Sequence, residues 1–493
     1  MKVKIGDEMA NVNGRGFRRI RDPIHGYVFL SREEMELLET AIFGRLRRIK
    51  QCSAEYLVYP GLTYSRFEHS LGVCHIITKM FDSLLKKYGE DGLEGILGDD
   101  MGRCGCDNIM SVRKLLRIVG LVHDIGHPPF SHAGERAISY LMSSSRKLNN
   151  FKREYERYKN RYFLAIHEFN TIKLLEKHGE LREKIENLMG VGIDYIRRML
   201  LNTRILKQFI GFESQIDADR MDYLLRDGYY SGAGFGIIDI DRLIADLLIE
   251  EGRLCLGYQS LSAAESLITE RYKIYKWVHL HHMCSIVNEL VSRTFYHAVE
   301  EGQLKPEWLI YASMCNSRSP VYADDSILYE LWREADRGSL TYIYADMLYR
   351  RKPPKALWKT LEEADERIGS ILSEKLMKIC ISGFDKVRLL EGEIARRLRL
   401  SPQDVLVVYS DFKPYKYPPR DGARTPEVHL YNPRWGGSRR LSELSAIIRE
   451  LRGHHYAFYT VALRDRDRIV DKLGEENIIR CIREAIEAVY EQL

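Results

Sequence analysis

The segment GLVHDIGHPPFSHAGE, residues 120–135, contains three of the chain's fifteen histidines, and His123 is followed directly by Asp124. The residues that lead into it, SVRKLLRIVGLVHDI, carry apolar side chains at the three- and four-residue spacing that predicts a buried helix. A glycine and two prolines follow the His-Asp pair and predict that the helix ends there. Histidines grouped with carboxylates are typical of metal binding or of proton transfer.

Two other stretches supply candidate ligands for an ion at the His-Asp pair. Because adjacent side chains on a helix point about 100° apart, His123 and Asp124 share one ion only if it lies over the surface between them. The stretch YSRFEHSLGV places His69 at the start of an amphipathic helix, and SQIDADRMDYLLRD places Asp219 in the first turn of another. Imidazole and carboxylate ligands together suit a borderline or hard divalent ion with open positions, which predicts a catalytic site. Taken singly, each residue also has a structural explanation, as a surface histidine, a turn residue, or a helix N-cap at Asp219 or Asp217.

Composition limits the class of protein. The chain has 493 residues, 45% of them hydrophobic, which suits a globular protein of roughly three domains. The net charge of +5, from 75 basic and 70 acidic residues, is too mild to indicate nucleic-acid binding by itself. No apolar run approaches the roughly 18 residues of a membrane helix, and the N-terminal residues lack the apolar segment of a secretion signal. The nine cysteines are scattered, which favours reduced thiols, and we expect a cytoplasmic protein without membrane contact.

The pattern of hydrophobic residues changes along the chain. From about residue 15 to 300 it is mostly helical, as in REEMELLETAIFGRLRRIKQ and SLGVCHIITKMFDSLLKKYGE. Beyond about residue 385, DVLVVYSDF and HHYAFYTVAL indicate short strands on either side of the loop PYKYPPRDGARTPE. We therefore predict a mainly α body with a small C-terminal α/β lobe, divided into a core at 1–310, a helical extension at 311–385 and the lobe at 386–493.

The segment SRKLNNFKREYERYKNRY, residues 145–162, alternates charged side chains with tyrosines. We interpret it as a solvated helix or an insertion. Contact between its basic side chains and a nucleic-acid backbone is a secondary alternative.

Five motifs occur in order: RIRDPIHGYVFL, RLRRIKQ, YPGLTYSRFEHSLGV, GLVHDIGHPPFSH and IDADRMDYLLRDGYYSG. Together they resemble the HD-domain dNTP triphosphohydrolases, a family that includes bacterial dGTPases and the mammalian SAM-and-HD-domain dNTPase, and the resemblance runs from about residue 17 to 300. It implies an HD-domain helical bundle that holds one divalent metal ion (Mn, Fe, Mg or Zn) through His69, His123, Asp124 and Asp219. The implied reaction is hydrolysis of a deoxynucleoside triphosphate such as dGTP to the deoxynucleoside and triphosphate, by attack at the α-phosphorus.

The resemblance also implies roles for other residues. His127 and His132 match the family's histidines behind the metal ligands and facing the phosphates, and His167 with Glu135 matches a His-carboxylate pair near the scissile bond. Imidazoles placed in this way can position water or protonate the departing 5′ oxygen. Seven match residues that bind the phosphates, the sugar or the base, namely Gln51, Arg66, Arg220, Tyr223, Asp227, Arg271 and His279. Within this set, Tyr223 resembles the tyrosine that excludes a 2′-OH, and Asp227 and Gln51 resemble partners of the sugar 3′-OH.

The chain departs from the family pattern at several positions. His279, followed by Leu280, stands where the family usually has a tyrosine near the sugar and base, which leaves the base preference open. Arg47 matches a guanine-contacting residue at the activator site of the mammalian tetramer. Other positions of that activator site differ, with glycine or glutamine at Gly44, Gly257 and Gln259. A nucleotide activator therefore stays an open alternative.

Two further functions stay open. One is a different HD phosphohydrolase, a nucleotidase or phosphodiesterase acting on mono-, cyclic or oligonucleotides, because the same ion activates water against any phosphoester. The other is a nucleotide- or nucleic-acid-binding regulator that keeps the fold without turnover. We expect a homo-oligomer, a dimer or tetramer, because the C-terminal lobe of the family takes part in oligomer contacts.

Overall fold

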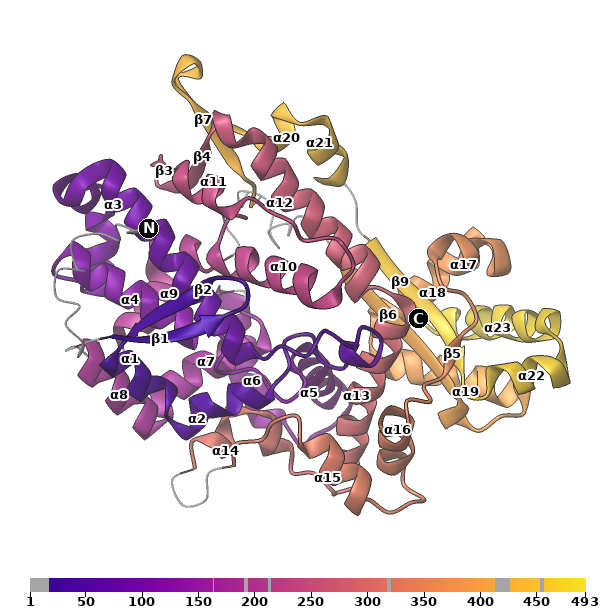
Figure 1. Cartoon of the computed structure of the whole chain (residues 1–493). Helices are drawn as coiled ribbons and strands as arrows, with labels where there is room; N and C mark the ends of the chain where they lie inside the picture. The colour runs from indigo at the N-terminus through magenta and orange to yellow at the C-terminus, as the bar shows by residue number, and fades with distance from the viewer. Residues whose placement is uncertain are drawn as a thin grey trace.

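The computed structural model of the chain describes residues 17–162, 164–189, 194–211, 214–316, 321–412, 426–452 and 456–493. Helices dominate these residues, and the described strands form three small sheets (Figure 1). The predicted fold class, mainly α with a small C-terminal α/β lobe, is confirmed. Among the described residues, no helix combines the length and the apolar character that crossing a bilayer requires.

The body of the molecule is a helical bundle preceded by the antiparallel hairpin of β1 (Phe17–Asp22) and β2 (Gly26–Ser31). Its helices are α1 (Arg32–Leu38), α2 (Ala41–Gly44), α3 (Arg66–Cys104), α4 (Ile109–Val122), α5 (Ser131–Ser144), α6 (Asn149–Tyr162), α7 (Ile166–Lys177), α8 (Gly179–Met189), α9 (Asp194–Asn202), α10 (Ala218–Ser231), α11 (Ile240–Ala245), α12 (Leu261–Ile274), α13 (His282–Glu300), α14 (Tyr311–Met314), α15 (Ile327–Glu334) and α16 (Leu340–Tyr349). Short turns of 3-10 helix lie at η2 (Arg45–Arg48), η3 (Glu55–Leu57), η4 (Leu206–Phe209), η5 (Tyr258–Ser260) and η7 (Pro306–Leu309), and a π-helical turn at η6 (Tyr275–His279). At the centre, α3 packs against α4 and α10, and α13 packs against α5 and α16.

The long helix α3 begins and ends at residues that the sequence specifies. Its N-cap, Ser65, and Glu68 form a capping box, in which each side chain accepts a hydrogen bond from the backbone N–H of the other residue. The helix bends at Gly89, and it ends at Gly105, where φ is +73° in the left-handed region that favours glycine. The cap fixes the position of the first turn, which carries His69.

The helical pattern predicted in residues 32–51 corresponds to three short pieces, α1, α2 and η2, and not to one continuous helix. The Thr40 side chain both accepts from the first turn of α2 and donates to a carbonyl at the end of α1, so the chain breaks there. The break turns the Arg45 side chain inward, where its guanidinium donates to the carbonyl oxygens of Ile125, at 3.1 Å, and His127. Arg45 thereby supports the loop that follows α4.

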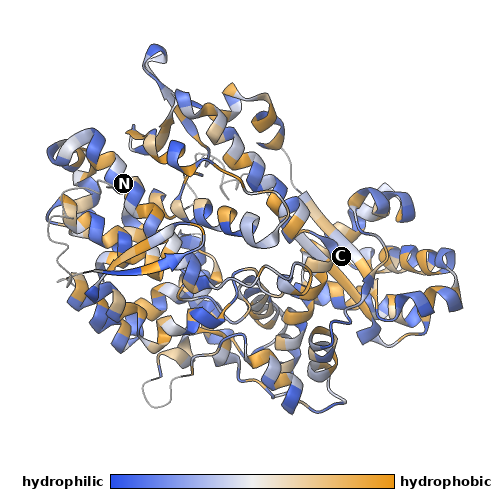
Figure 2. Ribbon diagram, viewed as in Figure 1, coloured by the Kyte–Doolittle hydropathy of each residue, from blue (hydrophilic) through white to orange (hydrophobic). Residues whose placement is uncertain are grey.

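The C-terminal lobe has a hydrophobic core of its own, which extends from Leu357 to Val489. Its antiparallel sheet has the order β5-β9-β6 and consists of β5 (Lys355–Ala356), β6 (Val405–Phe412) and β9 (Tyr456–Leu463). Around it lie α17 (Leu361–Ile368), α18 (Ser370–Ser382), α19 (Phe384–Leu398), α22 (Arg466–Leu473) and α23 (Glu475–Tyr490), with the turn η8 (Pro402–Asp404) before β6. Figure 2 shows the apolar strands β6 and β9 between helices that carry polar residues on their outer sides. Residues of α17 and α18, which precede residue 385, also contribute to this core. The domain boundaries at 310 and 385 stay a prediction.

Part of the C-terminal sequence lies against the body. β7 (His429–Asn432) pairs in parallel with β4 (Arg253–Gly257). The resulting sheet has the order β3-β4-β7-β8, with β3 at Leu247–Glu250 and β8 at Gly437–Arg440. The turn η9 (Pro433–Trp435) lies between β7 and β8, and α20 (Leu441–Leu444) and α21 (Ala446–Arg452) follow close to α12 (Figure 1). The predicted loop PYKYPPRDGARTPE lies mostly outside the described residues.

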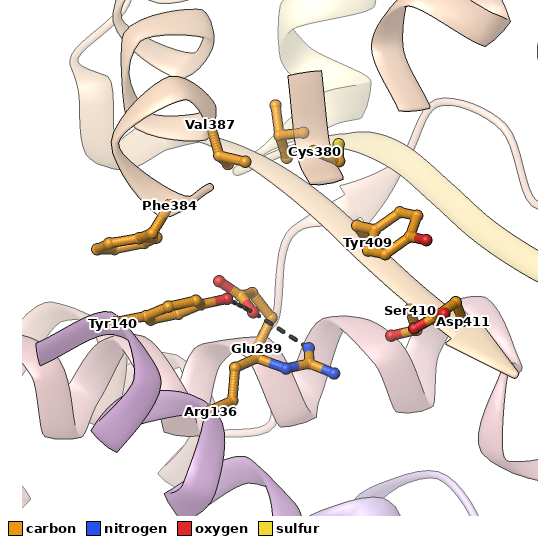
Figure 3. Close-up of a pocket in the computed structure, with 10 residues that line it drawn as sticks. Arg136, Tyr140, Glu289, Cys380, Phe384, Val387, Tyr409, Ser410 and Asp411 are labelled. Carbon is orange, nitrogen blue, oxygen red and sulfur yellow. Dashed lines mark hydrogen bonds and ion pairs between the residues drawn. The ribbon is translucent and has the colours of Figure 1, made fainter. Parts of the chain in front are cut away.

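A cavity of about 210 Å³ lies where α5 and α13 meet the lobe (Figure 3). The rings of Tyr140 and Phe384 stack on one side of it at 3.8 Å, and the Tyr140 hydroxyl donates to the Glu289 carboxylate at 2.7 Å. Of the described residues that line it, none is a site residue predicted from the sequence. The candidate site therefore lies elsewhere, around the end of α4.

Candidate metal centre

The His-Asp pair lies at the end of α4, as the sequence predicts. His123 is the C-cap residue of this helix, and its Nδ1 lies 2.9 Å from the carbonyl oxygen of Gly120. Because a carbonyl only accepts, Nδ1 carries the proton and Nε2 keeps a lone pair. That Nε2 atom is buried and has no hydrogen-bond partner among the described residues, and it lies 3.4 Å from Oδ1 of the neighbouring Asp124. The end of α4 thus presents an unused imidazole lone pair beside a buried carboxylate.

His69 and Asp219 come to this corner from two other helices. His69 lies in the first turn of α3 and is fully buried, and its Nε2 lies 3.7 Å from Oδ2 of Asp124. Asp219 lies in the first turn of α10, which Asp217 caps, and its Oδ1 is 3.0 Å from the same Nε2. The imidazole rings of His69 and His123 have centroids 5.2 Å apart. The structure therefore brings together all four residues that the resemblance implied as ligands.

The charges around this corner favour a cation. Burial alone raises the pKa of Asp124, but the guanidinium of Arg66 and the nearby imidazoles outweigh burial and hold that pKa well below its usual range. Burial lowers the pKa of His69, yet hydrogen bonds to Asp219 and to a second carboxylate raise it to about 9. A proton on Nε2 of His69 thus balances carboxylate charge at the place where a cation would do the same.

The donor set fits a divalent metal ion. Nitrogen atoms of His69 and His123 and a carboxylate oxygen of Asp124 all lie within 4.8 Å of one another, which is a spacing that one ion can bridge. Two imidazoles with two carboxylates suit borderline ions such as Zn²⁺, Fe²⁺ or Mn²⁺, and do not by themselves select among them. The unpartnered Nε2 of His123 is the observation that most directly indicates such an ion.

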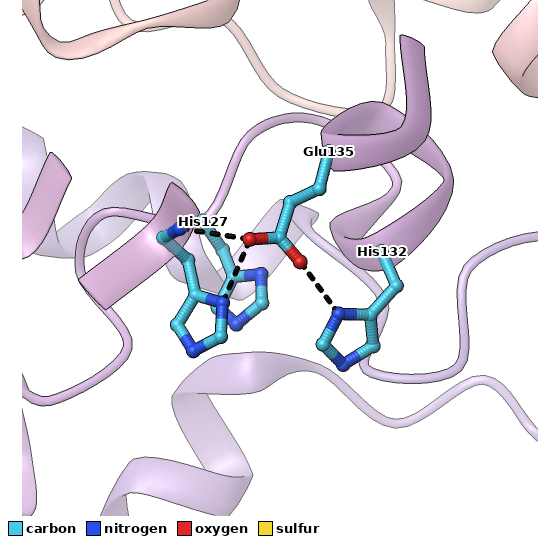
Figure 4. Close-up of side chains that lie close together, drawn as sticks. His127, His132 and Glu135 are labelled. Carbon is cyan, nitrogen blue, oxygen red and sulfur yellow. Dashed lines mark hydrogen bonds and ion pairs between the residues drawn. The ribbon is translucent and has the colours of Figure 1, made fainter. Parts of the chain in front are cut away.

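A second histidine cluster lies next to this corner (Figure 4). Glu135 joins two of its rings, because Oε2 lies 2.6 Å from Nδ1 of His132 and Oε1 lies 2.8 Å from Nδ1 of His167. Burial lowers the pKa of His167, but Glu135 outweighs it and raises the pKa to about 9. The side chain of His132 is 70% exposed, so its remaining nitrogen faces solvent or a ligand. The four predicted catalytic residues therefore form one cluster.

His127 connects the two groups. Its ring stacks on His167 with centroids 3.9 Å apart, and its Nε2 lies 3.4 Å from Oδ1 of Asp124. Burial and the positive charges of Arg66 and His167 hold the pKa of His127 well below its usual range. The ring is therefore neutral, and its buried Nδ1 has no partner.

Three buried arginines lie around the same region, at the predicted phosphate-binding positions. Arg66 donates to the Ser131 hydroxyl at 2.8 Å and to Asp124, whereas its buried Nη2 has no partner in the part of the chain that the structure describes. Arg220 donates to Asp217 at 2.9 Å and keeps a buried Nε without a partner. Arg271 donates to the Tyr223 hydroxyl at 3.1 Å, which places two predicted substrate contacts side by side. Unused N–H groups on two of these arginines suit recognition of an anion.

Two of the predicted sugar- and base-binding residues, Asp227 and His279, lie in one buried network. Oδ1 of Asp227 accepts from the Tyr64 hydroxyl at 2.7 Å and from the Cys52 thiol at 3.0 Å, and Oδ2 lies 3.0 Å from Nε2 of His279. Nδ1 of His279 lies 2.8 Å from Glu55. Burial lowers the pKa of His279, but Glu55 and Asp227 raise it well above its usual range. This histidine is therefore held as a cation between two carboxylates, at the end of the π-helical turn η6.

Two residues that sequence reasoning missed contact the metal corner indirectly. Asp222 lies one turn along α10 from Asp219, and its Oδ2 is 2.7 Å from Nδ1 of His69. His25, in the turn between β1 and β2, lies 2.6 Å from the other oxygen of Asp222. Both residues occur inside motifs that carried the resemblance, RIRDPIHGYVFL and IDADRMDYLLRDGYYSG. For Asp222, the sequence signal is the three-residue spacing in DRMD, which places Asp219 and Asp222 on one face of a helix.

At the compared activator positions, the guanidinium of Arg47 is exposed and lies over the ring of Phe67, 3.4 Å from its centroid. A side chain at Gly257 would meet the carboxylate of Asp246 at 2.7 Å.

The segment predicted as a solvated helix forms α6, whose Phe151 and Tyr155 are buried against Phe169 of α7. This helix therefore packs along one face.

The class of protein follows from the fold and the site together. Residues 66–207 match the HD domain family, and residues 238–477 match the HD-associated region. The chain is therefore an HD-domain protein with an HD-associated region, and the resemblance noted in its sequence is confirmed. HD domains bind divalent metal ions, in keeping with the donors described above.

Individual relatives are distant. The uncharacterized protein YwfO of Bacillus subtilis is 28% identical over 349 residues, which cover 68% of this chain and 71% of that protein. A Dictyostelium discoideum homologue of the deoxynucleoside triphosphate triphosphohydrolase SAMHD1 is 28% identical over 312 residues, 60% of this chain but only 53% of the relative. A crystal structure of a phosphohydrolase from Bacteroides thetaiotaomicron shares the fold, with a TM-score of 0.62 at 20% identity over 91% of this chain and 99% of that one.

Proposed function

We propose that this protein hydrolyses deoxynucleoside triphosphates to the deoxynucleoside and inorganic triphosphate, with one divalent metal ion held by His69, His123, Asp124 and Asp219. The observation that carries the proposal is the buried Nε2 of His123, which keeps an unused lone pair beside Asp124. A structural histidine at this depth normally satisfies both ring nitrogens. A bound ion accounts for the unused one, and it would supply Lewis-acid polarisation of a phosphate oxygen and lower the pKa of a bound water.

The chain's own residues account for binding of a triphosphate. Within the described part of the chain, the buried Arg66 and Arg220 each keep an N–H without a partner, and the polyphosphate of a nucleotide is an anion with which such groups pair. Arg271 holds the Tyr223 hydroxyl, which fixes the ring against the sugar, where it leaves no room for a 2′-OH. The amide oxygen of Gln51 is buried without a partner and accepts the hydrogen bond of a 3′-OH.

The histidine cluster accounts for the proton that the leaving group needs. Cleavage beside the α-phosphorus releases the 5′ oxygen of the nucleoside, which must gain a proton. Glu135 fixes His132 through Nδ1 and leaves the Nε2 edge of this exposed ring available to deliver that proton. His167, held by the same carboxylate, keeps a positive charge near the phosphate.

The substrate and the products test the proposal directly. Purified protein is incubated with Mn²⁺ and each of the four dNTPs, with ribonucleotides as a comparison and the Asp219→Ala variant as a control. We expect triphosphate and deoxynucleoside in equal amounts from the wild type and neither from the variant. Pyrophosphate or orthophosphate as product, or hydrolysis of mono- or cyclic nucleotides alone, would assign the protein to another HD phosphohydrolase activity. Salt-dependent nucleic-acid binding without any turnover would assign it to the regulators.

We further propose that the chain works in the cytoplasm as a homo-oligomer, a dimer or tetramer. The Dictyostelium relative is named as a dNTP triphosphohydrolase homologue, and the C-terminal lobe offers a separate core and surface for contacts between subunits. Light scattering with and without dGTP measures the number of subunits and reveals any nucleotide-driven assembly.

A further inference from the structure

A continuous chain of buried hydrogen bonds leads from the metal corner to the β1–β2 turn. Nδ1 of His69 lies 2.7 Å from Oδ2 of Asp222, and Nε2 of His25 lies 2.6 Å from Oδ1 of the same carboxylate. Arg226 donates from Nε to Oδ2 of Asp222 at 2.7 Å and from Nη2 to Asp22 at 2.9 Å. The side chains of His69, Asp222 and Arg226 are fully buried, and that of His25 is 3% exposed.

Asp222 decides which nitrogen of His69 faces the candidate ion. A carboxylate only accepts hydrogen bonds, so Nδ1 of His69 carries its proton toward Asp222, and Nε2 is the nitrogen left to face Asp219 and Asp124. A carboxylate behind a metal-binding imidazole fixes the ring orientation and makes the ligand more basic. His123 gains the same tautomer from a neutral carbonyl, so the charged partner is specific to His69.

The fold reserves space for this carboxylate. A Cβ at Gly72 of α3 would lie 1.8 Å from Oδ1 of Asp222 and 2.5 Å from Nη2 of Arg226. Only glycine at this position lets α10 approach α3 closely enough for Asp222 to reach His69. The close approach of the two helices and the hydrogen bond between them depend on each other.

At the end of this hydrogen-bond series that lies away from the metal corner, Asp22 fixes the turn of the hairpin. Oδ1 of Asp22 accepts from the backbone N–H groups of Ile24, at 2.9 Å, and His25, at 2.8 Å, which closes the turn and aims the His25 ring inward. Oδ2 of Asp22 receives Arg226. The turn is therefore joined to α10 by two charged contacts, one through Arg226 and one through His25.

From this geometry we propose that Asp222 is a positioning residue that orients His69 for metal binding, and that His25 of the β1–β2 turn holds Asp222 in place. This inference rests on the proposed metal site. It adds that the hairpin, although it supplies no ligand of its own, sets the affinity of the site for its ion.

Metal affinity tests the inference independently of turnover. Binding of Mn²⁺ to the full-length protein is measured by competition with a chelating indicator, for the wild type and for Asp222→Asn, His25→Phe and His25→Gln. We expect Asp222→Asn to weaken Mn²⁺ binding by about 10- to 100-fold. His25→Phe keeps the ring contact with His75 but loses the hydrogen bond, so a smaller loss is expected. His25→Gln can still donate to Asp222 and should recover most of that loss.

Two controls separate positioning from stability and from the metal site itself. Asp100→Asn alters another buried aspartate, which accepts from the backbone of residues 204–206 far along α3, and should lower the unfolding temperature without changing Mn²⁺ affinity. The absorption bands of bound Co²⁺ should shift in Asp222→Asn and stay unchanged in Asp100→Asn. His69→Ala should lose Mn²⁺ binding, and if it does not, the proposed metal site fails together with the inference.

Wild-type Mn²⁺ affinity in Asp222→Asn, with binding still lost in His69→Ala, would overturn the inference and leave the metal site standing. If Asp222→Asn does not fold, the two His25 variants test the inference. Equal Mn²⁺ affinities in His25→Phe and the wild type would overturn the role of the hydrogen bonds from His25 through Asp222 to His69. A weaker affinity in His25→Phe that is recovered in His25→Gln would support it.

Discussion

The substitution Glu135→Gln is expected to alter both the pH dependence of stability and the rate of turnover. Glu135 receives Nδ1 of His132 at 2.6 Å and both the backbone N–H and Nδ1 of His167 at 2.8 Å. Glutamine has the same shape but only one accepting oxygen and no charge. It can keep the contacts with His167 or the contact with His132, and it removes the carboxylate that contributes most to the raised pKa of His167, so that only the more distant charges of Glu168 and Asp124 remain.

The structure gives the size of the stability effect. The pKa of His167 rises from 6.5 to about 9 in the folded protein, which corresponds to about 3–4 kcal/mol at roughly 1.4 kcal/mol per pKa unit. Because the folded pKa is raised, this contribution is fully present below about pH 6.5 and is lost as the pH rises through about 9. In Glu135→Gln, the free energy of unfolding should be lower near neutral pH and should no longer decline across that window.

Urea unfolding between pH 6 and pH 9.5 measures this window, and the rate of triphosphate release from dGTP with Mn²⁺ is followed over the same range. We expect kcat to fall by about 10²- to 10⁴-fold, the contribution of a positioned acid or base. Glu154→Gln is the matched control. Glu154, in α6, pairs with Lys173 of α7, the helix that also carries His167, but it contacts no histidine of the cluster. The reasoning is refuted if Glu135→Gln reproduces the wild-type pH profiles of stability and rate.

Three further outcomes are expected. His132→Ala should lower kcat by about 10²- to 10⁴-fold with Mn²⁺ affinity unchanged, and an equal loss of metal would contradict its role as proton donor. Gly126→Ala places a Cβ 2.3 Å from the backbone of His167 and Thr171, so chemical denaturation should show a loss of about 1–3 kcal/mol; wild-type stability would contradict the close approach. Treatment with a chelator should abolish turnover, and added Mn²⁺ should restore it in the wild type but not in Asp219→Ala; activity that survives chelation would argue against a metal enzyme.

Much of the architecture could be predicted from local sequence. The apolar spacing before His123 and the prolines after it define the end of α4, and Ser65 and Glu68 mark the start of α3. The hydrophobic pattern did not predict where helices are interrupted by a single side chain. At Thr40, hydrogen bonds of the hydroxyl end α1 and begin α2 within the helical stretch 32–51.

Contacts between residues far apart in the sequence could not be predicted from the spacing of hydrophobic residues. The parallel pairing of β7 with β4 joins residues far apart in the sequence, and no local pattern specifies it. The convergence of His69 and Asp219 on Asp124 was implied by the family resemblance, and spacing alone did not require it. For Asp222, the three-residue spacing from Asp219 indicates only a shared helix face, because its role depends on His69 and His25, which other elements of the fold bring to it.

The most direct test of the account is a crystal structure of the protein with Mn²⁺, solved with anomalous scattering at a wavelength where manganese is distinguished from lighter ions. The account predicts one strong anomalous peak about 2.0–2.3 Å from Nε2 of His69, Nε2 of His123 and carboxylate oxygens of Asp124 and Asp219. A peak among His132, Glu135 and His167 instead, or none near the end of α4 at saturating Mn²⁺, would contradict it.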